Sequence, residues 1–139
     1  HQLHEAGVPV GVLIAPVIPM ITDHDLEAIL EAAHEHGARA AGYVLLRLPN
    51  EIKDIWREWL ELHFPDRAAH VLSLMRQMHG GKEYDASFGT RMSGTGPVAD
   101  LIRKRFEKKH RELGFTRLPA LATHLFQPPQ EKSPQGQLF

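Results

Sequence analysis

The chain has 139 residues and a net charge of −1, with 42% hydrophobic and 24% charged residues, the composition of an ordinary globular domain. This length allows one hydrophobic core and excludes a complete eight-unit β/α barrel of about 250 residues, and no apolar run approaches the roughly 18 residues of a membrane span. The chain contains no cysteine, so these residues supply no disulfide, thiolate nucleophile or cysteine-bound metal, which is compatible with a cytoplasmic location.

The small net charge conceals an uneven distribution. Residues 1–81 carry a net charge of −5, residues 82–117 carry +4, and residues 118–139 are balanced. A basic second part beside an acidic first part favours a polyanionic partner, such as DNA, on one side of the molecule.

The first predicted element is a short helical stub. Residues 1–7 resemble the last turns of a helix that ends at Gly7, without the Met and the capping residue of a natural start. We therefore expect the chain to be the C-terminal part of a longer protein.

A strand, a helix and a second strand are predicted next. Val8–Val17 is a near-continuous apolar run, as in a strand that is buried on both faces. Thr22 or Asp23 can cap a helix that ends near residue 36, and Ala40–Leu48 is again apolar. A βαβ unit of this length predicts that the two strands are parallel neighbours.

Three longer helices are expected after this unit. Apolar residues recur at helical spacing over residues 51–63, 67–78 and 98–113. Trp56 and Trp59 lie three positions apart in the first of these helices. They are predicted to be core anchors, with an aromatic binding site as the alternative.

The segment 79–96 has no such periodicity and contains five glycines in 18 residues. Loops of this length in compact domains are functional or disordered. Gly94, Thr95 and Gly96 precede a helix start, where free backbone N–H groups and the helix dipole suit an oxyanion, and Arg91 can add a forked donor pair. These four residues are our candidate anion or substrate site, and the alternative is a flexible turn before a capped helix.

The outer face of the last helix is basic. It is either a solvated surface or a surface that binds phosphates rather than bases, because no aromatic residues are interleaved with the charges. Its residues are Arg103, Lys104, Arg105, Lys108, Lys109 and Arg111. The ten histidines lack the spacing of a metal site, so no metal is expected.

The ends of the two predicted strands are a further candidate region, because parallel sheets bind ligands at the carboxyl ends of their strands. Residues 16–19 and 46–49 lie at these ends. Arg47 could contact a ligand there or form a structural ion pair.

Three segments in chain order carry a family resemblance: Ala15-Pro-Val-Ile-Pro-Met-Ile-Thr-Asp, Ala41-Gly-Tyr-Val-Leu-Leu-Arg-Leu-Pro and Phe88-Gly-Thr-Arg-Met-Ser-Gly-Thr-Gly-Pro. Together they resemble the C-terminal half of radical S-adenosylmethionine proteins, in the DNA repair photolyase-like branch related to spore photoproduct lyase. The resemblance covers nearly the whole chain. It implies an α/β fold: a fragment of a partial (β/α)6 barrel with parallel strands, followed by helices and an extended C-terminal tail.

This resemblance divides the chain into three parts. We expect late β/α units of the barrel over residues 1–64, a helical C-terminal extension with the glycine-rich loop over 65–114, and an extended or disordered tail over 115–139.

The resemblance also implies cofactors. In that family, three cysteines spaced C-x3-C-x2-C hold a [4Fe–4S] cluster, which cleaves S-adenosylmethionine to a 5′-deoxyadenosyl radical. Because this chain lacks cysteine, the cluster is expected in the part of a parent protein that precedes His1, and this chain alone should generate no radical. The residues implied to flank the adenosine of S-adenosylmethionine are Pro16, Ile18, Pro19, Arg47 and Leu48.

One position departs from the family pattern. Met20 stands where relatives have a small residue, usually Gly, in a Pro-Gly-x-Asn/Thr-Asp turn. This difference leaves the geometry of that turn open.

The chain end carries a second resemblance. Gln135, Leu138 and Phe139 match the Gln-x-x-Leu-Phe core of peptides that dock on the bacterial sliding clamp. An unstructured tether would present two apolar anchors to a preformed pocket, with Gln135 bonding nearby backbone. Gly136 departs from the Leu common at that position, which should weaken binding.

Our leading hypothesis is therefore the C-terminal part of a radical S-adenosylmethionine enzyme that acts on DNA or a nucleotide-like substrate. One alternative is a non-catalytic α/β module that binds a partner, such as the clamp, through its tail. Another is a phosphate-ester binding protein that uses Arg91 and residues 94–96. Since a barrel fragment has exposed strand edges, we also expect these residues to self-associate when expressed alone.

Overall fold

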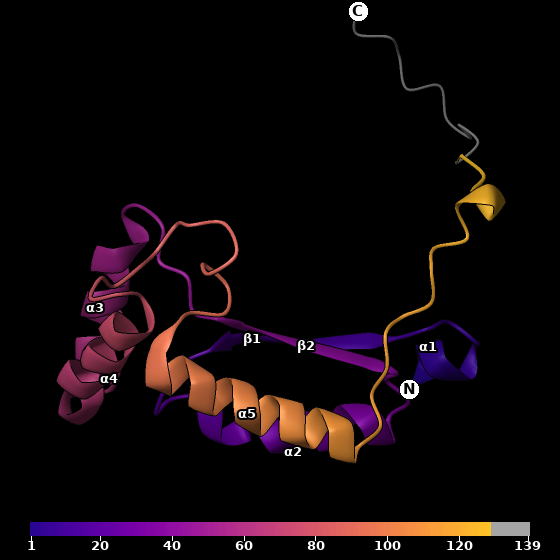
Figure 1. Cartoon of the computed structure of the whole chain (residues 1–139), viewed down its shortest axis with the longest axis horizontal. Coiled ribbons are helices and arrows are strands. Elements are labelled where there is room, and N and C mark those ends of the chain that lie inside the picture. Colours follow the sequence, from indigo (N-terminus) through magenta and orange to yellow (C-terminus); the bar gives the residue numbers. More distant parts are fainter. Residues whose placement is uncertain (129–139) are drawn as a thin grey trace, which may run out of the picture.

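The computed structural model describes residues 1–128, which form an α/β structure with one parallel sheet of two strands (Figure 1). The elements are α1 (Gln2–Glu5), β1 (Gly11–Val17), η1 (Asp23–Asp25), α2 (Leu26–Glu35), β2 (Ala40–Leu45), α3 (Ile52–His63), α4 (Pro65–Met78), α5 (Gly96–Glu112) and η2 (Thr123–Leu125). No helix within this part of the chain combines the length and the apolar character that crossing a membrane requires.

The predicted βαβ unit is confirmed. The strands β1 and β2 pair in parallel, with Gly11 opposite Ala40 and Ile14 opposite Tyr43, and α2 makes the crossover between them. The register shifts between Ile14 and Val17, where β1 carries an irregularity. The α/β class is thus correct, while the sheet itself is open, with only these two strands in the described residues.

The two faces of the sheet differ in what covers them. Figure 1 shows α2 and α5 below the strands. Apolar residues of both helices fill this side of the sheet. One example is Phe106 of α5, whose ring lies 4.8 Å from that of Tyr43 on β2. On the opposite face, Leu13 is 65% exposed. Its side chain lies over Gly42: a Cβ added to Gly42 would be 3.3 Å from Cδ1 of Leu13. One face is a core and the other is uncovered in the described residues, so the prediction that the first strand is buried on both faces is wrong.

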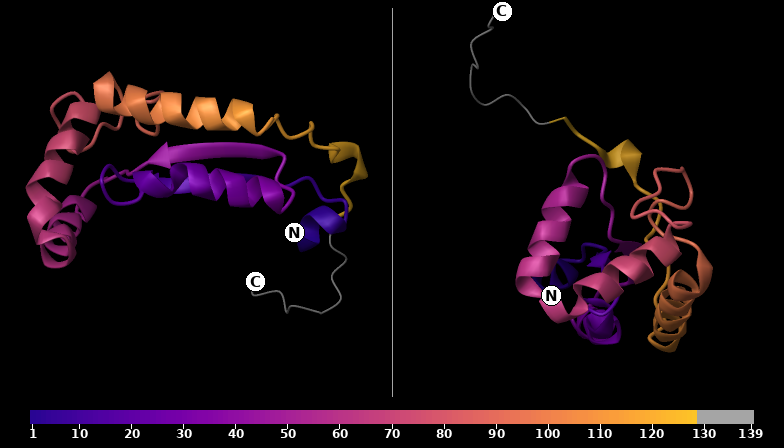
Figure 2. Two further views of the ribbon diagram at one scale, coloured as in Figure 1. Left: turned by 90° about the horizontal axis from the view of Figure 1, so that it is seen from below. Right: turned by 90° about the vertical axis from the view of Figure 1, so that its left-hand side faces the viewer.

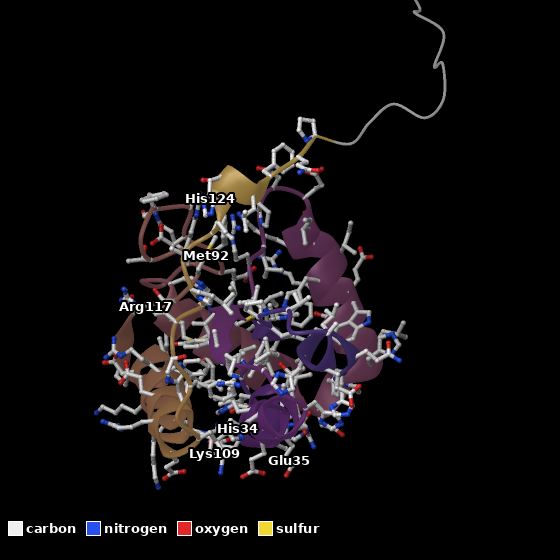
Figure 3. The ribbon with its side chains drawn as sticks, turned by 90° about the vertical axis from the view of Figure 1, so that its right-hand side faces the viewer. His34, Glu35, Met92, Lys109, Arg117 and His124 are labelled. Atoms are coloured by element: carbon white, nitrogen blue, oxygen red, sulfur yellow. The ribbon has the colours of Figure 1, made fainter. Side chains whose placement is uncertain are left out.

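Charged residues fasten α5 to α2. Arg105 donates to both carboxylate oxygens of Glu27 over 2.8 and 2.7 Å and to the Asp23 carboxylate over 3.1 Å, and Lys109 pairs with Glu31. The hydrogen bonds from Arg105 hold the pKa of Glu27 below its usual range. Figure 3 shows Lys109 at the same end of the molecule as the end of α2. Two cations of the basic segment 82–117 are therefore paired with carboxylates of the acidic segment 1–81.

The hairpin of α3 and α4 lies beyond the carboxyl ends of the strands (Figures 1 and 2). Its apolar residues join the same core as β1, β2 and α5, and Leu60, Val71 and Met75 are fully buried. The rings of Trp56 and Trp59 stack 5.1 Å apart, with Trp56 packed against the core and Trp59 partly exposed. Trp56 is thus a core anchor, as predicted, whereas the same prediction for Trp59 is wrong, because Trp59 is 38% exposed and lies outside the core.

After α5 the chain crosses the amino ends of the strands. Phe115 is buried, the Thr116 N–H donates to the carbonyl oxygen of Arg39 over 2.8 Å, and Leu118 lies near Gly11 on the uncovered face. Beyond this contact, Leu121 and Phe126 are exposed. The chain therefore leaves the core after Leu118.

The uncovered sheet face generates a prediction about self-association. Replacing Leu13 with Gln removes an exposed apolar side chain from that face, so we expect the isolated chain to shift toward monomer in light scattering at high concentration, with the free energy of unfolding changed by less than about 0.5 kcal/mol. Leu62→Gln is the matched control, because Leu62 is 76% exposed on α3, away from the sheet. Equal association of both variants would contradict a role for the sheet face.

Candidate functional site

The glycine-rich loop, residues 79–96, lies at the carboxyl end of β2 (Figure 1). The Leu45 N–H donates to the carbonyl oxygen of Met92 over 2.9 Å, so the loop covers part of the free edge of β2. The Thr95 N–H donates to the carbonyl oxygen of Met78 over 2.9 Å, which closes the loop on the end of α4.

A buried carboxylate ties this loop to the helical hairpin. The side chain of Glu83 is 11% exposed, and its two oxygens accept from Arg57 of α3 over 2.8 Å and from Arg76 of α4 over 3.2 Å. Two cations on different helices thus share one carboxylate. This contact fixes where the loop starts its path across the strand ends.

A second carboxylate orders the middle of the loop. Asp85 accepts from the Ser87 N–H over 3.0 Å, from the Ser87 hydroxyl over 2.6 Å and from the Thr90 hydroxyl over 2.9 Å. These hydrogen bonds stabilise the ionised form and lower the pKa of Asp85 to about 2. Asp85 therefore keeps this turn together as an anion at neutral pH.

Three side chains meet where β2, α4 and the loop come together, and we name Arg47, His79 and Tyr84 the Arg47 cluster. Arg47 is half-buried and donates from Nη2 to the Tyr84 hydroxyl over 3.2 Å. The ring of Tyr84 lies 6.4 Å from that of His79, which is only 4% exposed and bonds through Nδ1 to the carbonyl oxygen of Met75 over 2.9 Å. No carboxylate in residues 1–128 forms an ion pair with Arg47.

Arg91 lies elsewhere on the loop and has a different neighbour. Its guanidinium carbon is 5.2 Å from the centre of the Phe88 ring, and that ring is 92% exposed. The pair is a cation–π contact at the surface. Arg91 thus offers a positive charge beside an aromatic face that nothing in the described chain covers.

The geometry of Gly94, Thr95 and Gly96 favours the turn over the anion site. The Gly94 N–H donates to the carbonyl oxygen of Thr90 over 2.7 Å and the Thr95 N–H is also bonded within the protein, so two of the three expected donors are occupied. A Cβ added to Gly94 would lie 2.9 Å from Cδ1 of Leu45. Close packing against β2 therefore explains this glycine.

The five residues implied to flank S-adenosylmethionine separate into two groups. Ile18, Pro19 and Leu48 are buried in or beside the core and offer little surface to a ligand. Pro16 is exposed and Arg47 is half-buried, so these two remain available at the strand ends.

The turn after β1 answers the question left open by Met20. Met20 adopts a φ of 62°, the conformation that favours glycine, and its N–H donates to Asp23 over 2.7 Å. Thr22 closes the same turn, accepting from the Ile18 N–H and donating to the Pro16 carbonyl oxygen, each over 2.9 Å. Met20 therefore holds the backbone conformation that favours glycine, and its turn is closed by Thr22 and Asp23.

The remaining candidate sites are a metal site and the motif at the end of the tail. In the described part of the chain, no three His, Asp or Glu side chains are placed to hold a metal ion. The whole sequence lacks cysteine, so its residues do not fit the thiolate ligation of a [4Fe–4S] cluster. Gln135, Leu138 and Phe139 lie outside the described residues.

The chain matches no family model, no curated protein and no solved structure. The radical S-adenosylmethionine resemblance therefore rests on the sequence motifs alone.

Sequence analysis missed His79, Glu83 and Tyr84. Their contacts join positions far apart in the chain, such as Arg47 and Tyr84, which are 37 residues apart. The one local signal was the group of polar side chains at the start of the loop: His79, Lys82, Glu83, Tyr84 and Asp85.

The packing of Gly94 generates a stability prediction. Gly94→Ala should lower the free energy of unfolding by about 2–4 kcal/mol, because it combines an unfavourable φ of 64° with a clash against Leu45. Gly80→Ala is the control: φ is 62° there, but nothing lies within 4 Å of an added Cβ, so only about 1–2 kcal/mol should be lost. Urea unfolding measures both, and equal losses would show that close packing is not the reason for Gly94.

Proposed function

We propose that this chain is one wall of a β/α barrel enzyme of the radical S-adenosylmethionine class. The observation that carries the proposal is the uncovered sheet face. In β/α barrels, parallel strands face the interior and helices cover the outside, and this chain has helices on one face of a parallel pair and the exposed Leu13 on the other. A parallel sheet is normally covered on both faces, so further strands would complete it.

The polar groups of the chain gather where such enzymes act. Active sites of β/α barrels lie at the carboxyl ends of the strands, and this is where the Arg47 cluster and the glycine-rich loop are found. The uncovered Phe88 ring beside Arg91 supports a nucleotide-like substrate or DNA, because aromatic faces stack on bases and arginines neutralise phosphates.

In this proposal, the longer parent protein supplies the ligands of the iron–sulfur cluster, and this chain supplies contacts with S-adenosylmethionine. Bound to a reduced cluster, S-adenosylmethionine supplies a 5′-deoxyadenosyl radical that abstracts hydrogen from a substrate. This chain provides no cluster ligand, and Pro16 and Arg47 are its residues available to S-adenosylmethionine. Its own part in the reaction is to line the barrel and to hold substrate at the strand ends.

The coding region upstream of the codon for His1 provides the test. We expect in-frame β/α units with a C-x3-C-x2-C segment, and we expect the longer protein, reconstituted with iron and sulfide, to form 5′-deoxyadenosine from S-adenosylmethionine and a reductant. A variant with those cysteines replaced by Ala is the control and should form none. A longer protein without the cysteines, or one that forms no 5′-deoxyadenosine, would contradict the proposal.

A second candidate function is docking on the bacterial sliding clamp through the tail. It is favoured by the path of the chain, which leaves the core after Leu118: residues 119–128 are exposed, and Gln135, Leu138 and Phe139 come after them in the sequence. A linear peptide on such a tether can bind a preformed pocket without changing the domain.

The clamp proposal predicts that purified clamp binds the whole chain and loses at least about tenfold in affinity for a Leu138→Ala, Phe139→Ala double variant, because both apolar anchors are removed. Leu121→Ala, Leu125→Ala is the matched control, since it removes two exposed leucines that lie before the motif. Surface plasmon resonance measures both, and equal affinity of the two double variants would exclude the motif.

A further inference from the structure

The outer side of α3 carries a row of exposed apolar side chains. In a helix, residues three and four positions apart lie on the same side, and these residues are spaced by three, four and three positions. A different side of α3, with the fully buried Leu60, packs into the core. We name the exposed row the α3 stripe; its residues are Ile52 (46% exposed), Ile55 (64%), Trp59 (38%) and Leu62 (76%).

The continuity and the spacing of the α3 stripe indicate a helical partner. Single exposed apolar residues are ordinary on a protein surface, whereas a contiguous apolar row marks an interaction surface. Apolar residues that alternate at spacings of three and four form the seam along which two helices pack side by side. The spacing of the α3 stripe therefore matches a second helix.

Trp59 lies in the middle of the stripe and is held in place by other rings. Its ring centre is 5.1 Å from that of Trp56, 5.1 Å from that of His63 and 5.5 Å from that of Phe64. A ring that is fixed before binding loses little conformational freedom when a partner covers it, and Trp is among the residues that most often dominate binding energy. The α3 stripe thus has a preformed central anchor.

Two glutamates border the stripe on one flank. Glu51 is four positions before Ile55, and Glu58 is four positions before Leu62, so both adjoin the stripe on the helix surface. Both glutamates are exposed, and neither forms an ion pair within residues 1–128. A partner helix that complements this flank carries lysine or arginine there.

The two cations of α3 do not neutralise this flank. Arg57 pairs with Glu83 and Asp54. Lys53 is three positions before Trp56, on the side of the helix that packs into the core. The flank beside the stripe is therefore acidic.

The same charges disfavour a second copy of this chain as the partner. Two α3 helices packed antiparallel along their stripes would bring the glutamates of one copy against those of the other, and facing like charges oppose association. The basic helix α5 of a second copy lacks the seam, because Leu101 is the only large apolar residue of α5 that is exposed.

We propose that the α3 stripe binds a basic amphipathic helix of another protein, whose apolar seam covers Ile55, Trp59 and Leu62 and whose flank pairs with Glu51 and Glu58. This surface lies on the side of the molecule opposite α5 (Figure 2). It does not depend on radical chemistry, so its test is separate from that of the proposed function.

Two synthetic helical peptides test the surface. Both carry the same leucines at spacings of three and four, and they differ only along one flank, which is lysine in the first and glutamate in the second. Each is titrated into the whole chain while the indole N–H signal of Trp59, assigned with Trp59→Phe, is followed by NMR. We expect the lysine peptide to shift this signal and to bind at least about tenfold more tightly than the glutamate peptide. Equal binding of the two peptides, or no shift at Trp59, would overturn the proposal.

A double variant tests the apolar contact. Ile55→Gln, Leu62→Gln removes two exposed side chains of the stripe and should weaken binding of the lysine peptide at least about tenfold. Leu101→Gln, Ile29→Gln is the matched control, since it removes two exposed apolar side chains from α5 and α2, and it should bind normally. Binding that persists in the first double variant would contradict the role of the stripe.

A second double variant tests the charges. Glu51→Gln, Glu58→Gln should reduce the preference for the lysine peptide to less than about threefold, and added salt should reduce it in the unaltered chain, because exposed charge pairs are screened. An unchanged preference would contradict the role of the glutamates.

Light scattering without peptide examines the other occupant. The unaltered chain and the Ile55→Gln, Leu62→Gln variant should associate to the same extent, because the stripe does not bind a second copy. If the variant alone were monomeric, a second copy would be the partner and the proposal would be wrong.

Discussion

The attachment of α5 to α2 is the contact on which the rest of the structure depends. Arg105 reaches Glu27 and Asp23 with four hydrogen bonds, one of them to the Asp23 backbone, and this brings Ile102 and Phe106 onto the sheet. Because α5 begins at Gly96, docking it also fixes where the glycine-rich loop must end. Arg105 and Glu27 are 78 positions apart in the sequence, and their contact places both the core and the loop at the strand ends.

The βαβ unit could be predicted from sequence because its determinants are local. An apolar run, a 3.6-residue period and a second apolar run suffice to specify parallel neighbours, and the structure agrees. The residues of the candidate site were harder to predict from the sequence. Glycines at 94 and 96 suggested free N–H groups, but the donors of Gly94 and Thr95 are taken by Thr90 and Met78, which only the folded path of the loop reveals. Burial of Ile18 and Leu48 likewise follows from packing against helices distant in the chain.

The basic residues of α5 show that a cluster of charges in the sequence does not by itself identify a binding surface. Arg105 and Lys109 turn toward α2, and Arg103 and Lys108 pair with Asp100 and Glu112 on their own helix, so four of the six basic residues form ion pairs within the fold. The positive groups that matter at the strand ends, Arg47 and Arg91, belong to other elements. Position relative to the sheet, rather than clustering in sequence, distinguishes the two groups.

The shared carboxylate of Glu83 has a mechanical consequence. Since Glu83 pairs with Arg57 and Arg76 at once, it links α3, α4 and the start of the loop, and residues 79–82 are the only backbone between the end of α4 and this contact. A displacement of the loop at residue 83 therefore acts on both helices of the hairpin, and not on the loop alone.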